Sequence, residues 1–89
     1  MIIDSHCHLN YEPMSLSLKE IIQRANKDGV KYLLTISTED KSFDKILNII
    51  SHNKCVYGTY GIHPHEAKNH KLIESVDIIN KVYSNKKII

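Results

Sequence analysis

Apolar and polar residues follow one another along the chain in blocks that predict alternating strands and helices. Residues 1–5, 30–37 and 55–60 are short runs of β-branched and apolar residues, which favour buried strands. The segments that follow them carry apolar residues every three or four positions, which is typical of helices that bury one face. These expected faces consist of Leu18, Ile21, Ile22 and Ala25; of Phe43, Ile46, Leu47 and Ile50; and of Leu72, Val76, Ile79 and Tyr83.

Local signals indicate where the first two helices begin and end. Ser17 and Glu20 have the spacing of a capping box, so the first helix is expected to begin there. Gly29 is expected to stop that helix, because glycine readily adopts the conformation that follows a helix end. Ser37 or Thr38 is expected to cap the second helix. The last four residues, KKII, predict the start of a fourth strand.

Strands that alternate with helices predict an α/β fold with a parallel sheet and right-handed crossovers. The strands are expected to begin near residues 2, 30, 56 and 87. Each βα unit then takes about 30 residues, as eight units in about 250 residues require. We therefore expect about three βα units from the N-terminal part of a (β/α)8 barrel, with strands in the order 1-2-3. An open, doubly wound sheet is the alternative, and both would be incomplete. Residues 1–89 are thus expected to be a single, truncated portion of a barrel.

Composition narrows the classes of protein to consider. The apolar share of 42% and the charged share of 25% are ordinary for a globular domain. The net charge of +2 is too small to indicate nucleic-acid binding by itself. Cys7 and Cys55 lie far apart with no C-x-x-C pair, which favours reduced thiols over a disulfide framework. Without a signal segment or an apolar run near the ~20 residues of a membrane span, we expect a cytoplasmic protein that does not contact a membrane.

The first candidate site is the pair His6 and His8, directly after the first expected strand. Residues i and i+2 of a strand share a side, so both imidazoles are expected to project together where barrel sites gather. Two such imidazoles can bind one divalent ion. Cys7 is expected to point away, toward the helices. Asp4, one repeat earlier, is expected to orient a ligand histidine. A chance H-x-H triplet on a surface loop is the alternative.

The second candidate site is the stretch GIHPHEA, residues 61–67, directly after the third expected strand. Gly61 is expected to turn the backbone and Pro64 to stiffen it. His63 and His65 would then lie at the same end of the sheet as His6 and His8. From their type and position alone, these two residues could bind a metal, donate to a phosphate oxygen, or have no function. His52 and His70 are assigned no role.

Together, D-S-H-x-H near the start and G-x-H-P-H some fifty residues later resemble the TatD family of metal-dependent deoxyribonucleases. The resemblance implies a (β/α)8 hydrolase that cleaves phosphodiester bonds in DNA. It also implies a divalent metal site for Mg²⁺, Mn²⁺ or Zn²⁺, with two ions in full-length members. It assigns His6 and His8 as metal ligands. His63 is the stronger, and His65 the weaker, candidate for contact with substrate or phosphate.

The resemblance covers only the first part of the family pattern. Family members continue with a glutamate ligand in a G-E-x-G-L-D-Y-type motif on the fourth strand, and with later histidines and an aspartate. None of these follows in residues 1–89. Three interpretations are therefore open: a hydrolase of this family, an inactive remnant of a split gene, or one piece of a split barrel completed by a second chain. A small metal-binding module of other ancestry is disfavoured by the paired motifs.

Overall fold

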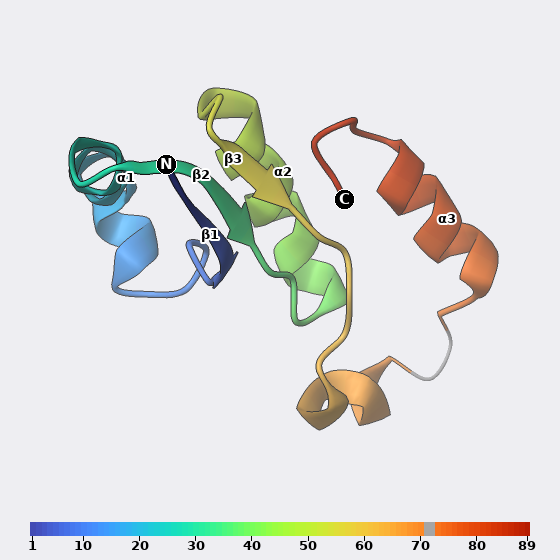
Figure 1. Cartoon of the computed structure of the whole chain (residues 1–89). Helices are drawn as coiled ribbons and strands as arrows, with labels where there is room; N and C mark the ends of the chain where they lie inside the picture. Colours follow the sequence, from blue (N-terminus) through green and yellow to red (C-terminus); the bar gives the residue numbers. More distant parts are fainter. Residues whose placement is uncertain (71–72) are drawn as a thin grey trace.

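The computed structural model describes residues 1–70 and 73–89, in which strands and helices alternate (Figure 1). The strands are β1 (Ile2–Cys7), β2 (Val30–Thr35) and β3 (Val56–Gly58). The α-helices are α1 (Leu18–Lys27), α2 (Phe43–His52) and α3 (Ser75–Tyr83). Short 3-10 helices η1 (Met14–Ser17), η2 (Asp40–Ser42) and η3 (Pro64–Asn69) lie between them. The expected β-α alternation is confirmed, although β2 and β3 each end two residues early.

The sheet has the order β1-β2-β3, and both strand pairs are parallel. The predicted start of a fourth strand is also present, since Ile88 forms a parallel bridge with Gly58. The Gly58 N–H donates to the Lys87 carbonyl at 2.9 Å, and the Ile89 N–H donates to the Gly58 carbonyl at 2.9 Å. Each strand therefore lies beside its neighbour in sequence. This is the order of a barrel, and the doubly wound alternative is wrong.

Helices α1 and α2 cover one face of the sheet and enclose the hydrophobic core (Figure 1). The expected helical faces are largely confirmed, because Ile22 of α1 and Phe43, Ile46 and Ile50 of α2 are all buried. Ile49 is buried too, although the helical period did not place it on the expected face. The buried apolar side chains are Leu9, Ile22, Leu33, Phe43, Ile46, Ile49, Ile50, Val56 and Ile88.

The expected start and end of the first helix are confirmed, whereas the expected cap of the second helix is wrong. Ser17 is the N-cap residue of α1, which begins at Leu18, but its side chain makes no cap hydrogen bond, because the turn of η1 runs directly into α1. Ser42 occupies the cap position of α2, so neither Ser37 nor Thr38 caps that helix. Gly29 has a φ of 96° just past α1, which is the left-handed conformation expected of a glycine that ends a helix.

The other face of the sheet is apolar and open. Ile3, Tyr32, Leu34, Tyr57 and Ile89 line a cavity of about 330 Å³ on this face. Ile3, Tyr32 and Ile89 are exposed. In a closed barrel, this face would be filled by side chains from the other strands.

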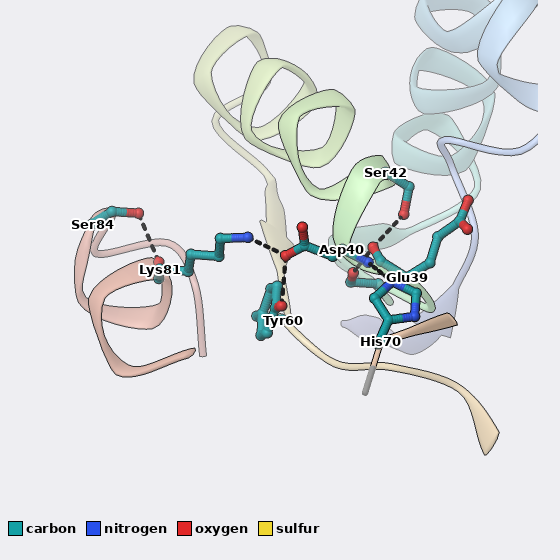
Figure 2. A network of polar contacts seen from close by, with 8 residues as sticks. Glu39, Asp40, Ser42, Tyr60, His70, Lys81 and Ser84 are labelled. Carbon is teal, nitrogen blue, oxygen red and sulfur yellow. Dashed lines mark hydrogen bonds and ion pairs between the residues drawn. The ribbon is translucent and has the colours of Figure 1, made fainter. Parts of the chain in front are cut away.

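Helix α3 does not bury the apolar face that its periodicity predicts. Val76, Ile79 and Tyr83 are exposed, and Leu72 lies outside the described residues. The periodicity is helical, as expected, but no described element packs over that face. Helix α3 instead contacts the rest of the chain through Val82, which packs against the core, and through an ion pair between Lys81 and the Asp40 carboxylate. Figure 2 shows the ion pair.

Asp40 is the centre of this polar contact. The Tyr60 hydroxyl donates to Asp40 Oδ1 at 2.7 Å, beside the Lys81 ammonium (Figure 2). The hydrogen bonds from Lys81 and then from Tyr60 lower the pKa of Asp40. Desolvation, followed by the hydrogen bond to Asp40, raises the pKa of Tyr60 to about 12. The network therefore requires an ionised Asp40 and a neutral Tyr60.

We expect Asp40 to make stability fall in acid. Its pKa is lower in the folded chain than the ~3.9 of an unfolded aspartate, so its contribution is present above about pH 4. That contribution is lost as the pH falls through the lowered folded-state pKa. The pair is about one-third exposed, so solvent screening limits the loss to about 1 kcal/mol or less. Urea unfolding between pH 2 and pH 7 measures the free energy of unfolding, which should fall less in acid for Asp40→Asn than for wild type. Asp44→Asn, which removes an exposed carboxylate nearby, is the control, and equal pH profiles for Asp40→Asn and wild type would contradict the assignment.

Candidate metal and substrate site

The residues that follow β1, β2 and β3 meet in a cleft at the carboxyl end of the sheet. The cleft has a volume of about 310 Å³. Its lining residues are His8, Tyr11, Thr38, His63, His65 and Glu66. They come together because the carboxyl ends of adjacent parallel strands share one edge of a sheet. Three of the four histidines selected from the sequence therefore lie around a single cleft.

His6 and His8 lie close together at the end of β1. Their ring centroids are 5.2 Å apart, in an edge-to-face arrangement. Cys7 between them is half-buried and packs against the core, and its thiol contacts the Leu34 carbonyl at 3.4 Å. Burial, with a smaller contribution from Asp4, raises the pKa of Cys7 to about 11. The thiol is therefore protonated at neutral pH and acts as a small apolar side chain.

Asp4 does not contact a histidine ring. Its Oδ1 accepts a hydrogen bond from the backbone N–H of His6 at 3.1 Å. The register of β1 is irregular here: Asp4 pairs with Leu33 and Cys7 with Thr35, so three steps on β1 oppose two on β2. Asp4 therefore holds His6 through its main chain and not through its ring. Its expected role in orienting a ligand histidine stays a prediction.

His8 has an unusual environment for a loop histidine. Its ring stacks on Tyr11 at a centroid distance of 4.9 Å and an interplanar angle of 25°. Its Nδ1 is buried and has no hydrogen-bond partner among the described residues. A buried polar atom without a partner is costly, and an imidazole nitrogen of this kind fits metal coordination. Nδ1 of His8 is therefore suited to bind a divalent metal ion.

His63 and His65 are held by a short local network. The backbone N–H of His65 donates to His63 Nδ1 at 3.1 Å, and the two ring centroids are 4.6 Å apart. Because Nδ1 of His63 accepts, the neutral ring carries its proton on Nε2 and can donate from there. Pro64 is the first residue of η3, and its expected role in stiffening the turn stays a prediction. Gly61 is not in the left-handed region, so this turn does not depend on glycine.

Several residues around the cleft were missed by sequence reasoning. Tyr11, Thr38 and Glu66 line it, and Thr38 had been considered only as a helix cap. His70 ties η3 to η2, since its Nε2 accepts from the Asp40 N–H at 3.1 Å and its Nδ1 pairs with the Glu66 carbonyl at 2.7 Å. The first of these bonds is visible in Figure 2. No sequence signal marks these residues, because their roles depend on contacts between separate loops.

The described residues supply few metal-binding groups beyond His6 and His8 at the end of β1. Across residues 1–70 and 73–89, no group of three or more His, Cys, Asp or Glu residues is placed to hold a metal ion. His6 and His8 thus form a pair of candidate ligands. In the same part of the chain, no helix is both long and apolar enough to cross a membrane.

Comparison with known proteins finds relatives that are named metal-dependent hydrolases or deoxyribonucleases. Residues 3–89 match the family described as TatD related DNase. An uncharacterized metal-dependent hydrolase of Buchnera aphidicola is 32% identical over 99% of this chain and 34% of its own length. The uncharacterized metal-dependent hydrolase YjjV of Escherichia coli is 31% identical over 76% of this chain and 26% of its own length. A human protein named a deoxyribonuclease is 28% identical over 71% of this chain and 23% of its own length.

The crystal structure of YjjV, a TatD homolog, has the same fold as this chain. It superposes with a TM-score of 0.81 at 24% identity, over 99% of this chain and 34% of the crystallised one. This chain therefore spans about a third of the length of such relatives. Its sheet and helices correspond to three βα units of a (β/α)8 barrel. By sequence and by fold, the chain belongs to the TatD family of metal-dependent hydrolases.

Proposed function

We propose that this chain forms part of the active site of a metal-dependent deoxyribonuclease, in which His6 and His8 bind a divalent cation and His63 contacts a phosphate of DNA. The observation that carries this proposal is the cleft, where His8 from the β1 end faces His63 and His65 from the β3 end. The human relative named a deoxyribonuclease supports DNA as the substrate.

Each residue has a task that its surroundings support. His6 and His8 bind the cation, and imidazole suits Zn²⁺ better than it suits Mg²⁺ or Mn²⁺. Asp4 fixes the main chain of His6. His63 donates from Nε2 to a phosphate oxygen, with His65 beside it as a second donor. A bound divalent metal would polarise the phosphoryl oxygen and lower the pKa of a water, and a full-length member would hold two ions.

Metal binding by the two β1 histidines is the direct test. We expect wild type to bind Mn²⁺ or Zn²⁺ weakly, because the chain offers only two imidazoles. The His6→Ala, His8→Ala double variant should bind at least about tenfold more weakly, since ligand changes cost at least as much as changes around the ligands. Titration calorimetry measures the metal affinity of wild type and of the double variant, and paramagnetic resonance of Mn²⁺ measures the same affinities for that ion. His52→Ala, at the far end of α2, is the control. Equal affinity of wild type and the double variant would refute the assignment.

The open apolar face favours a second proposal about how the site is completed. Ile3, Tyr32, Leu34, Tyr57 and Ile89 form a surface suited to cover by further βα units. Such units would also supply the ligands that this part of the chain lacks. They could belong to a second chain, as in a split barrel, whereas an inactive remnant would have no such complement. Sedimentation with and without a polypeptide that spans the later units of a relative tests this. Association of the two polypeptides would support the split barrel, whereas lack of association would support the inactive remnant.

We also propose a cytoplasmic location. Cys7 and Cys55 are both free, as is usual for proteins of a reducing compartment. Localisation of a tagged chain by microscopy or fractionation would test this.

A further inference from the structure

We propose that Tyr11 and Thr38 are positioning residues that hold His8 and His63 in fixed relation across the cleft. This inference rests on the proposed function, because it assigns Tyr11 and Thr38 to the same metal and phosphate site. Neither residue is a proposed metal ligand, and neither belongs to the motifs that identify the family. Their contacts, however, connect the loops that follow all three strands.

Tyr11 contacts His8 through the face of its ring. The two rings are nearly parallel, with centroids 4.9 Å apart. The backbone supports this contact, since the Tyr11 N–H donates to the His8 carbonyl at 3.2 Å. A metal binds an imidazole nitrogen in the plane of the ring, so a partner that fixes this plane also fixes the direction of coordination. Tyr11 is 44% exposed, which shows that burial in the core is not its main role.

Thr38 links Tyr11 to the second pair of histidines. Its hydroxyl shares a hydrogen bond with the Tyr11 hydroxyl. Its carbonyl accepts from the His63 N–H at 2.7 Å. Thr38 is 9% exposed, so both contacts lie in a sheltered position. The path His8–Tyr11–Thr38–His63 therefore joins the β1, β2 and β3 loops without passing through the hydrophobic core.

This path accounts for features that the two motifs leave unexplained. Within residues 1–70 and 73–89, Nδ1 of His8 has no hydrogen-bond partner, so no hydrogen bond from that atom to this part of the chain fixes the rotation of the ring. The neighbouring Leu9 N–H donates to Thr35 Oγ1 at 3.1 Å, which anchors the main chain but not the His8 ring. The described ring contacts of His8 are an edge-to-face contact with the exposed His6 ring at 5.2 Å and the stack on Tyr11 at 4.9 Å. The stack lies along the face of the His8 ring, so it is the contact that sets the ring plane. The Thr38 hydroxyl in turn sets the position of Tyr11.

The test uses variants of the whole 89-residue chain. Tyr11→Leu removes the stack, Tyr11→Phe removes only the hydroxyl, and Thr38→Val removes the hydroxyl partner while keeping the carbonyl. Tyr32→Leu is the matched control, since Tyr32 is 43% exposed on the open face of the sheet. Thermal unfolding identifies any variant that is not folded.

The first readout needs no metal. A stacked tyrosine shifts the ring-proton resonances of His8 by its ring current, and two-dimensional NMR of the imidazole protons detects this. Tyr11→Leu should move these resonances toward random-coil positions, and Tyr32→Leu should not. Tyr11→Phe and Thr38→Val should produce smaller movements in the same direction. Unchanged His8 resonances in a folded Tyr11→Leu variant would overturn the proposal.

The second readout is affinity for Mn²⁺ or Zn²⁺. We expect Tyr11→Leu to weaken binding about tenfold, the usual lower range for residues that orient a metal ligand. Tyr11→Phe and Thr38→Val should each have a smaller effect. The Tyr11→Phe, Thr38→Val double variant should bind no more weakly than either single variant, because each substitution removes the same hydrogen bond between the two hydroxyls. Additive losses would refute the linked path. If wild type binds no metal, the proposed function fails, and the NMR result alone still decides whether Tyr11 positions His8.

Discussion

DNA hydrolysis by the 89-residue polypeptide is expected to be at least about a hundredfold slower than by a full-length family member, with Mg²⁺, Mn²⁺ or Zn²⁺ added. Loss of a residue that merely orients a ligand costs 10–100-fold, so the lack of ligands costs at least as much. Catalytic zinc sites use three protein ligands, whereas His6 and His8 supply two. Across the part of the chain that is described, no third group joins them. A two-metal site at ~3.5–4 Å also needs a bridging group.

The measurement is cleavage of a labelled DNA substrate, with the human relative named a deoxyribonuclease as the positive control. The His6→Ala, His8→Ala double variant, purified in the same way, defines the background. If wild type shows any turnover that the double variant lacks, the chain builds a working site by itself or as an oligomer, and the interpretation as an inactive remnant is refuted. Turnover by wild type within about a hundredfold of the positive control would contradict the expected rate.

Replacing Ile46 by alanine is expected to lower the free energy of unfolding by about 2–5 kcal/mol, the usual range for a large aliphatic side chain in a core. Ile46 is fully buried at the centre of α2, where it faces β3 and the start of the fourth strand. The free energy of unfolding of a folded domain is about 5–15 kcal/mol, so the variant should lose a large part of its stability. Urea unfolding followed by circular dichroism measures the change. Leu16→Ala, at a residue 73% exposed, should change stability by less than about 0.5 kcal/mol.

Gly58 provides an internal check on this prediction. A Cβ atom at Gly58 would lie 2.6 Å from Cγ2 of Ile46 and 3.2 Å from Cδ1 of Ile88. Gly58→Ala alone should therefore cost about 1–3 kcal/mol through overpacking. In the Ile46→Ala background its cost should be smaller, because the new methyl group enters the space that the isoleucine leaves. Additive losses would show that Ile46 does not pack against Gly58 as described.

The order of the elements was predictable because it depends on short-range patterns. A helix that buries one face repeats its apolar residues at short spacing, as Ile46 and Ile50 do, and such spacing is visible without a structure. The strand order follows from the same alternation, since a right-handed crossover between sequential parallel strands leaves few arrangements. The Ile88 bridge beside Gly58 extends that order by one strand. The capping box at Ser17 predicted the start of α1 correctly, but its side-chain hydrogen bond is absent, because a 3-10 turn precedes the helix there.

The candidate site was predictable only in part. The sequence by itself determined that His8, His63 and His65 follow strands of one parallel sheet, and hence that they share its carboxyl edge. Their roles as metal ligands and phosphate contacts stay predictions.

The tertiary structure alone decided which other side chains reach that edge. Tyr11 and Thr38 touch although 27 positions separate them, and Asp40 contacts Lys81 across 41 positions. It also decided that Asp4 holds a main-chain N–H, because a bulge in β1 changes the register beyond Asp4. Helix α3 keeps an apolar face that periodicity marks but no described element covers. The physical reason is common to all of these cases. Periodicity reports the conformation of neighbours in sequence, whereas contacts between loops depend on where the strands end in space.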